Sequence, residues 1–159
     1  MITVGSLVPS FSVVDTDKQT ITQEQLKGQP VLILFFPFAF TSVCTAELCA
    51  VRDDLSRYNA LNVRVIGVST DSPFTLAKFK ADQSLTFTLA SDYNKGMCQA
   101  FGAFYEEFSL GLKGVCRRAA FIVDADGVIR YAEVLESAGS LPDFEAIHQV
   151  LESIGQKVQ

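Results

Sequence analysis

The stretch VLILFFPFAFTSVC, residues 31–44, decides the fold, because a strand pattern passes directly into a helix start. Its first part, Val31–Phe36, is an unbroken apolar run of strand length that the next proline stops, which is typical of a strand buried on both faces. Thr41 and Ser42 are both good helix N-caps, so we expect a helix to begin near them. Cys44 then falls in the first helical turn, where free N–H groups and the helix dipole stabilise an anion.

Strand-like and helix-like segments alternate along the rest of the chain. The expected elements are strands at 64–69, 86–89 and 119–123, helices at 48–58, 72–79, 96–101 and 144–154, and hairpins at 11–22 and 119–134. Such alternation favours parallel strand pairs with helices on the sheet faces, and the hairpins add antiparallel strands. The expected fold class is therefore α/β, with a mixed central β-sheet flanked by helices.

The amino-acid composition limits which classes of protein this chain can belong to. A chain of 159 residues with 48% hydrophobic and 19% charged residues suits one packed domain spanning 1–159. Its formal net charge of −5 is the wrong sign for a protein that binds nucleic acid. The longest strongly apolar run, residues 31–40, is about half of the ~20 residues that a membrane helix needs. The N-terminus, MITVGSLVPS, lacks the pattern of a secretory signal, so we expect a soluble, cytoplasmic protein without a membrane partner.

The histidine and cysteine counts point to sulfur chemistry. His148 is the single histidine, which excludes a site built from several histidine ligands. The four cysteines, Cys44, Cys49, Cys98 and Cys116, contain no CxxC pair for a zinc ribbon. In a reducing cytosol we expect them to be free thiols rather than a structural disulfide framework.

Cys44 has suitable neighbours for a reactive thiol, because its helix start favours the thiolate form. The Thr41 hydroxyl lies one helical turn earlier and can donate to the thiolate or accept from a substrate hydroxyl. Pro37 has no N–H and can cover the sulfur against water. Glu47, one turn later, either orients a cation facing the site or is a solvated helix residue.

The spacing PxxxTxxC, read as Pro37, Thr41 and Cys44, resembles the active-site motif of the peroxiredoxins. The resemblance extends over nearly the whole chain, at Gly5-x-x-x-Pro9-x-Phe11, Leu26-Lys27-Gly28, GVSTDSP at 67–73 and RAAFIVD at 118–124. It implies a thioredoxin-like fold and makes Cys44 the peroxidatic cysteine. It also implies that Arg118, rather than Arg117, reaches the sulfur, and neighbouring strand residues do point to opposite faces.

The resemblance implies an antioxidant thiol peroxidase acting on hydrogen peroxide and organic hydroperoxides. The Cys44 thiolate attacks the terminal peroxide oxygen and becomes a sulfenic acid. Arg118 stabilises the thiolate and holds the peroxide oxygens, aided by the Thr41 hydroxyl and by backbone N–H groups at the helix start. Neither a metal nor an organic cofactor is required.

Two cycles remain open for reducing the sulfenic acid. The pair Cys44 and Cys49 resembles the bacterioferritin-comigratory, or Q-type, group, in which the second cysteine resolves the first. Five residues apart on a helix, the two Cα atoms are about 8.7 Å apart, beyond the roughly 7 Å that a disulfide tolerates, so the helix start must unwind. Glu47 instead suits the AhpE group, in which an external thiol attacks Cys44. Cys98 is a less favoured resolving residue, and Cys116 has no family precedent; packing is expected for both.

The resemblance also bears on the partners and on alternative functions. The reductant implied is of thioredoxin, glutaredoxin or mycoredoxin type, and resemblance to the AhpE group favours a homodimer, whereas Q-type relatives are often monomers. A redox sensor or holdase is the alternative without turnover. A thioredoxin-fold disulfide oxidoreductase is disfavoured because such enzymes carry CxxC. Phe38 and Phe40 flank the motif and suit either an apolar entrance or dimer packing.

Overall fold

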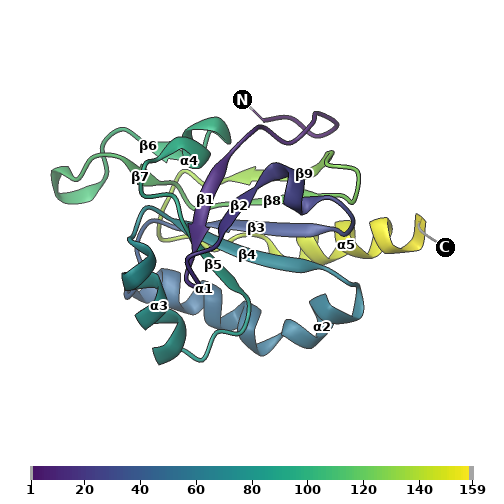
Figure 1. Ribbon diagram of the computed structural model, residues 1–159, viewed down its shortest axis with the longest axis horizontal. Coiled ribbons are helices and arrows are strands. Elements are labelled where there is room, and N and C mark those ends of the chain that lie inside the picture. The colour runs from purple at the N-terminus through teal and green to yellow at the C-terminus, as the bar shows by residue number, and fades with distance from the viewer. Residues whose placement is uncertain (1, 158–159) are drawn as a thin grey trace.

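A seven-stranded mixed sheet forms the centre of the computed structural model, which describes residues 2–157 (Figure 1). Its strands lie in the order β2-β1-β5-β4-β3-β8-β9. Their bounds are Ser12–Asp15 for β1, Thr20–Thr22 for β2, Val31–Phe35 for β3, Arg64–Ser69 for β4, Thr88–Ser91 for β5, Ala119–Val123 for β8 and Ile129–Val134 for β9. β3, β4 and β5 pair in parallel and the remaining pairs are antiparallel, which confirms the mixed sheet expected from the sequence.

β3 lies in the interior of the sheet, paired with β4 on one side and β8 on the other. All five of its side chains are buried, as the unbroken apolar run predicts. Because side chains alternate along a strand, Ile33 and Phe35 pack into one core while Leu32 and Leu34 pack into a second core on the opposite face. The helices must therefore cover both faces.

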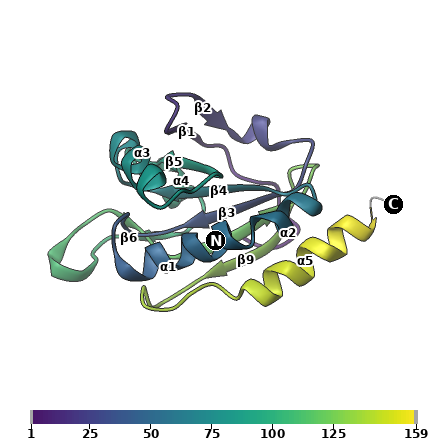
Figure 2. The ribbon, with the colours of Figure 1, turned by 90° about the horizontal axis from the view of Figure 1, so that it is seen from below.

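Five α-helices lie on this sheet: α1 Ser42–Asp53, α2 Leu55–Ala60, α3 Pro73–Asp82, α4 Gly96–Ala100 and α5 Phe144–Lys157. Residues of α1, α2, α3 and α5 contribute to one core, and α4 contributes to the other together with the β1–β2 hairpin. Figure 2 shows α1 and α5 along the same side of the sheet. No helix within residues 2–157 is long and apolar enough to cross a membrane.

Three local features differ from the sequence expectation. The helix expected over 48–58 is divided at Asp54 into α1 and α2. The strand expected at 86–89 begins two residues later, because Leu85 and Phe87 are buried in a core without being paired in the sheet. A second, two-stranded sheet, β6 Phe104–Tyr105 with β7 Val115–Cys116, was not expected, since two residues carry no readable periodicity.

Two 3₁₀ turns complete the described elements. One, Gln23–Leu26, follows β2 and buries Leu26 beneath the sheet. The other, Ser109–Gly111, lies in the loop between β6 and β7. That loop extends outward from one corner of the molecule, beside α4 (Figure 1).

Candidate active site

Cys44 lies where the chain leaves β3 and enters α1. The connecting loop is held by the Ala39 N–H, which donates to Asp71 Oδ2 at 2.8 Å. Thr41 is the N-cap residue, in extended conformation, and its carbonyl accepts the Thr45 N–H at 2.9 Å. Cys44 is therefore the third residue of α1, in the first turn, and only 1% of it is exposed.

The Thr41 hydroxyl does not cap the helix. It donates to the Phe38 carbonyl at 2.8 Å, and Thr41 makes no side-chain cap bond. Because its single proton is used in this bond, the oxygen is left as an acceptor toward the pocket that Thr41 and Cys44 both line. Of the two roles expected for this hydroxyl, acceptance from a substrate is the one that its geometry favours.

The guanidinium of Arg118 contacts the thiol of Cys44. Its Nη2 lies 3.1 Å from Cys44 Sγ, and the side chain is almost completely buried. Nε and Nη2 also donate to the Ala138 carbonyl at 3.1 and 3.0 Å. Arg117, in contrast, donates its backbone N–H to Ala103 and lays its guanidinium over the Tyr105 ring at 5.0 Å. Only Arg118 faces the thiol.

Glu47 completes a buried row of three ionisable side chains. Its Oε2 pairs with Arg118 Nη1, whereas Oε1 has no hydrogen-bond partner among the described residues. Burial raises the pKa of Glu47 to about 7, and the nearby Arg118 only partly opposes this shift. Burial works against the charged form of Arg118, but Glu47 and Cys44 outweigh it and raise the pKa of Arg118. The cation is thus retained beside the thiol.

A small pocket opens onto this row. Its volume is about 240 Å³, and it is lined by Pro37, Phe38, Thr41, Ser42, Val43, Cys44, Phe108, Arg118, Ala138 and Gly139. The rings of Phe38 and Phe108 lie 5.9 Å apart and form an apolar wall. The pocket therefore combines one thiol, one cation and an apolar wall, which suits a small polar group carrying an organic substituent.

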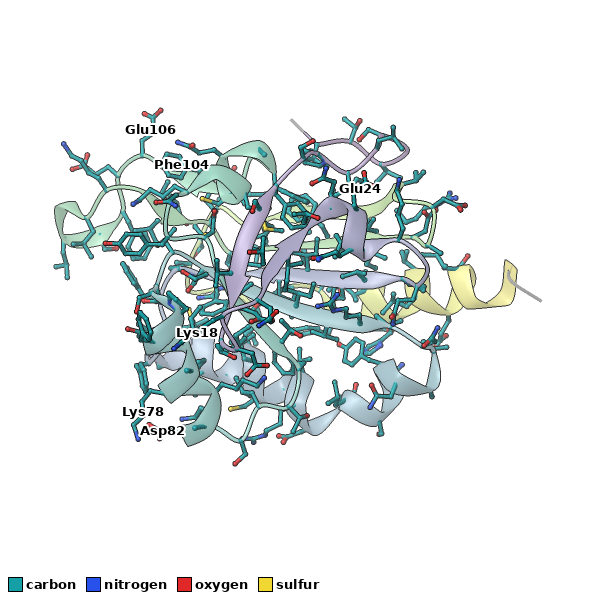
Figure 3. All side chains as sticks on the ribbon, viewed as in Figure 1. Lys18, Glu24, Lys78, Asp82, Phe104 and Glu106 are labelled. Carbon is teal, nitrogen blue, oxygen red and sulfur yellow. The ribbon has the colours of Figure 1, made fainter. Side chains whose placement is uncertain are left out.

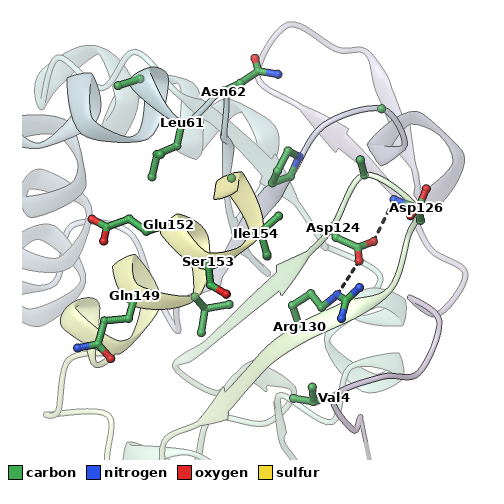
Figure 4. Close-up of a pocket in the computed structure, with 16 residues that line it drawn as sticks. Val4, Leu61, Asn62, Asp124, Asp126, Arg130, Gln149, Glu152, Ser153 and Ile154 are labelled. Carbon is green, nitrogen blue, oxygen red and sulfur yellow. Dashed lines mark hydrogen bonds and ion pairs between the residues drawn. The ribbon is translucent and has the colours of Figure 1, made fainter. Parts of the chain in front are cut away.

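A larger cavity, of about 1030 Å³, lies elsewhere in the molecule (Figure 4). Its lining includes Leu61, Ile154 and an ion pair in which Arg130 Nε lies 2.6 Å from Asp124 Oδ2. Within the described part of the chain it shares no lining residue with the Cys44 pocket. Size alone therefore does not identify the reactive site.

The other expected residues lie outside the Cys44 pocket. Cys49 is half-buried on α1 and its thiol donates to Gln83 Oε1 at 3.4 Å. Cys98 and Cys116 are fully buried close to one another. His148 is buried with its Nε2 3.2 Å from Asp54, consistent with a packing role.

Besides Gly139, two contributors to the pocket were missed from the sequence. The Ala138 carbonyl anchors Arg118, and a backbone carbonyl on a loop has no residue-type signature. Phe108 lies on the loop between β6 and β7, and its position depends on a hairpin too short to detect. Neither residue carries a signal that sequence patterns alone reveal.

Comparison with known proteins gives consistent matches. The model of the AhpC/TSA family matches residues 4–132. Peroxiredoxin Bcp of Escherichia coli K12 is 36% identical over 129 residues, covering 80% of this chain and 82% of that protein. Alkyl hydroperoxide reductase E of Mycobacterium bovis is 34% identical over 137 residues, covering 84% and 86%. The crystal structure of peroxidoxin BcpB from Mycobacterium tuberculosis superposes with a TM-score of 0.84 at 25% identity, covering 97% of this chain and 99% of that chain.

Proposed function

The chain belongs to the AhpC/TSA family of peroxiredoxins, and we propose that Cys44 is the nucleophile with which it reduces hydrogen peroxide and organic hydroperoxides. As a peroxiredoxin it is a thiol-dependent peroxidase with a thioredoxin-like fold. The observation that carries the assignment is the 3.1 Å contact between Arg118 Nη2 and Cys44 Sγ in the first turn of α1. A guanidinium cation and a helix N-terminus thus both lie at this sulfur, and each attracts negative charge.

The reaction proposed is a displacement on oxygen. The Cys44 sulfur forms a bond to the terminal peroxide oxygen while the O–O bond breaks. The leaving oxygen departs as an alcohol or water after taking a proton, and Cys44 is left as a sulfenic acid. Arg118 stabilises the charge that develops on the oxygens, and the Thr41 oxygen accepts from the substrate hydroxyl. Pro37 contributes to the wall that excludes water from the sulfur.

Glu47 has a positioning role in this proposal. It contacts Arg118 and not the substrate, so it acts by fixing the guanidinium in the orientation that faces Cys44. The Ala138 carbonyl holds the same guanidinium through its Nε and Nη2 atoms. Two fixed partners limit the rotation of a long side chain, which is what a pre-organised charge requires.

Cys49 is proposed as the resolving residue. Its thiol attacks the Cys44 sulfenic sulfur, a disulfide forms, and water leaves. Both cysteines lie on α1, where ideal geometry separates their Cα atoms by about 8.7 Å, so the first turns must unwind and Cys49 must leave Gln83. A thiol reductant of thioredoxin, glutaredoxin or mycoredoxin type then restores the dithiol. In the one-cysteine alternative, that external thiol attacks Cys44 directly.

Peroxide turnover with a thiol reductant, measured for four single Cys→Ser variants, tests the proposal. Cys44→Ser is expected to lose turnover, and Cys49→Ser to lose it with a reductant that acts only on disulfides. Cys98→Ser and Cys116→Ser are the matched controls, because neither residue lines the pocket. Turnover that survives Cys44→Ser would refute the nucleophile. A wild-type protein that consumes one equivalent of peroxide and never cycles would instead indicate a sensor.

Peptide mapping distinguishes the two recycling routes. Trypsin releases residues 28–52 as one peptide that contains both Cys44 and Cys49. After peroxide treatment without reductant, a Cys44–Cys49 disulfide removes two hydrogen masses from this peptide and blocks its alkylation. A peptide in which Cys49 alkylates and Cys44 carries added oxygen would support the one-cysteine cycle.

The cellular setting follows from the same chemistry. The proposed cycle needs a thiol reductant, which a reducing compartment supplies. We therefore place the enzyme in the cytoplasm, and fractionation of the producing cells tests this.

A further inference from the structure

Cys98 and Cys116 form a second pair of thiols, away from the Cys44 pocket. Their sulfur atoms and one carboxylate oxygen of Asp92 all lie within 4.8 Å of one another. Both cysteines are fully buried, one on α4 and the other on β7. The two positions are 18 residues apart in sequence, so only the tertiary structure brings them together.

The backbone fixes the approach of these two residues. The Cys98 carbonyl accepts the Ala103 N–H at 2.8 Å, and the Ala103 carbonyl accepts the Arg117 N–H at 2.8 Å. Ala103 thus forms one main-chain hydrogen bond with Cys98 on α4 and another with Arg117, the residue after Cys116. The main-chain bonds therefore hold the two backbones close together, and in the rotamers present the side chains bring the sulfur atoms within 4.8 Å of each other.

Asp92 already has a structural role beside the pair. Its Oδ1 accepts the Met97 N–H at 3.0 Å and its Oδ2 accepts the Cys98 N–H at 2.7 Å. The carboxylate therefore satisfies the first N–H groups of α4. This favours a reaction between the two thiols over a metal ion that uses Asp92 as its third ligand.

We propose that Cys98 and Cys116 are a second redox-active pair, which forms an intramolecular disulfide when hydroperoxide persists. One thiol reacts with the hydroperoxide to give a sulfenic acid and an alcohol or water. The other thiol then attacks the sulfenic sulfur, the S–S bond forms and water leaves. The sulfur atoms need only close from at most 4.8 Å to about 2.05 Å. The inference rests on the proposed peroxidase function only for the class of oxidant, which is a hydroperoxide.

This pair is expected to react more slowly than Cys44, because neither of its thiols lines the pocket, and its buried surroundings suit a disulfide. The neighbouring Cys98 thiol and burial raise the pKa of Cys116, and the charge of Asp92 adds to the effect. The thiolate form of Cys116 is thus scarce, so we expect the pair to oxidise only under sustained exposure. A disulfide carries no charge and remains compatible with the core around Phe35 and Phe101.

The disulfide would restrain a wall of the Cys44 pocket. It would close a loop over residues 98–116, which includes β6, β7 and the pocket residue Phe108. This loop extends from one corner of the molecule beside α4, and the Glu106 side chain on it points away from the sheet (Figures 1 and 3). Arg118 follows two residues after Cys116. Oxidation of the pair would therefore restrain the segment that carries Phe108.

The test uses a Cys44→Ser/Cys49→Ser protein, in which only the second pair remains. The folded protein is exposed to excess hydrogen peroxide, which catalase then removes before denaturation and alkylation. Trypsin cuts after Lys95, Lys113 and Arg117, so the disulfide joins peptide 96–113 to peptide 114–117. The linked species is expected to account for more than half of both peptides. Recovery of both as alkylated thiols, or as sulfinic acids without linkage, would overturn the proposal.

Two further arms keep the result specific. Cys98→Ser in the same background must abolish the linked species, and circular dichroism checks that this variant is folded. Native cleavage after the exposed Lys113 must leave fragments joined on a non-reducing gel only after oxidation. If Zn²⁺ protects both thiols of the folded, unoxidised protein from alkylation and a chelator reverses this, the pair is a metal site and the proposal is wrong. Because Cys44 is absent throughout, these outcomes do not depend on its role.

Discussion

The guanidinium of Arg118 lies 3.1 Å from the sulfur of Cys44, although the two residues are 74 positions apart in the chain. The pairing of β3 with β8 explains this contact. Phe35, the last residue of β3, is paired with Ala119, the first residue of β8. Arg118 comes just before β8. It therefore lies at the same end of the sheet as the segment that leads from β3 to Cys44.

Removing the charge of Arg118 is expected to impair both activity and stability. Arg118→Met should lower kcat/KM for hydrogen peroxide by about 10²–10³-fold, because a pre-organised donor to the reacting oxygens is lost. It should also reduce the free energy of unfolding by roughly 3–5 kcal/mol at pH 8, since buried Glu47 loses its partner. Urea unfolding and initial rates measure the two effects.

The double variant Arg118→Met/Glu47→Gln separates the causes. It should recover part of the stability because no unpaired buried carboxylate remains, while its activity stays low. A double variant no more stable than Arg118→Met would show that the Glu47 charge is not the source of the destabilisation.

Glu47 is expected to give the free energy of unfolding a distinctive pH dependence. Its pKa is raised from 4.5 to about 7 in the folded protein, so folding favours its protonated form. The resulting stability is fully present below about pH 4.5 and is lost as pH rises toward 7. The loss is on the order of 3 kcal/mol, since each pKa unit corresponds to about 1.36 kcal/mol.

Glu47→Gln should flatten this slope, as measured by urea unfolding at several pH values between 4.5 and 7.5. Glu24→Gln, at a surface glutamate paired with Lys27, is the matched control and should leave the slope unchanged (Figure 3). An unaltered slope in Glu47→Gln would mean that Glu47 does not titrate in this range.

Phe108 is expected to influence the choice of hydroperoxide. Phe108→Ala removes one half of the apolar wall formed with Phe38. Losing such a contact costs about 1–3 kcal/mol for a substrate that fills it, so kcat/KM for cumene hydroperoxide should fall about tenfold or more. Hydrogen peroxide has no organic substituent, and its rate should change less than about twofold.

The measurement for Phe108→Ala is the ratio of the two kcat/KM values. Phe74→Ala is the matched control, because Phe74 is exposed on α3 and does not line the pocket. Equal losses for both substrates in Phe108→Ala would argue for a general disturbance of the site rather than for specificity.

Gly67 on β4 allows Leu89 and Phe36 to pack closely against the strand. A Cβ at this position would lie 2.8 Å from Leu89 Cδ2 and 3.4 Å from Phe36 Cε1. Gly67→Ala should therefore reduce the free energy of unfolding by about 1–3 kcal/mol. Gly96→Ala, where a Cβ meets nothing within 4 Å, is the control and should be close to neutral.

Leu89→Val in the Gly67→Ala background should recover part of the stability, because it shortens the side chain that the new methyl group meets. Chemical denaturation measures all of these variants. If the free energy of unfolding does not recover in the double variant, the strain arises from the contact with Phe36 instead.

Local patterns were sufficient for most of the fold. The apolar run of β3 and the cap before α1 placed Cys44 in the first helical turn, since both signals involve only neighbouring residues. Signals from neighbouring residues did not predict the break at Asp54 or the later start of β5. For β5, the packing of Leu85 and Phe87 into the core, rather than local propensity, sets where the strand begins.

The sequence by itself determined the candidate nucleophile, the helix start that holds it and the mixed α/β architecture. Only the tertiary structure decided which groups surround that nucleophile. Glu47 and Arg118 meet across 71 positions, and the Ala138 carbonyl reaches the same guanidinium from a loop. The same is true of Cys98 and Cys116, which the sequence assigned to packing and the fold brought together. The physical reason is that strand pairing and core packing bring distant segments into contact, whereas periodicity and capping describe only adjacent residues.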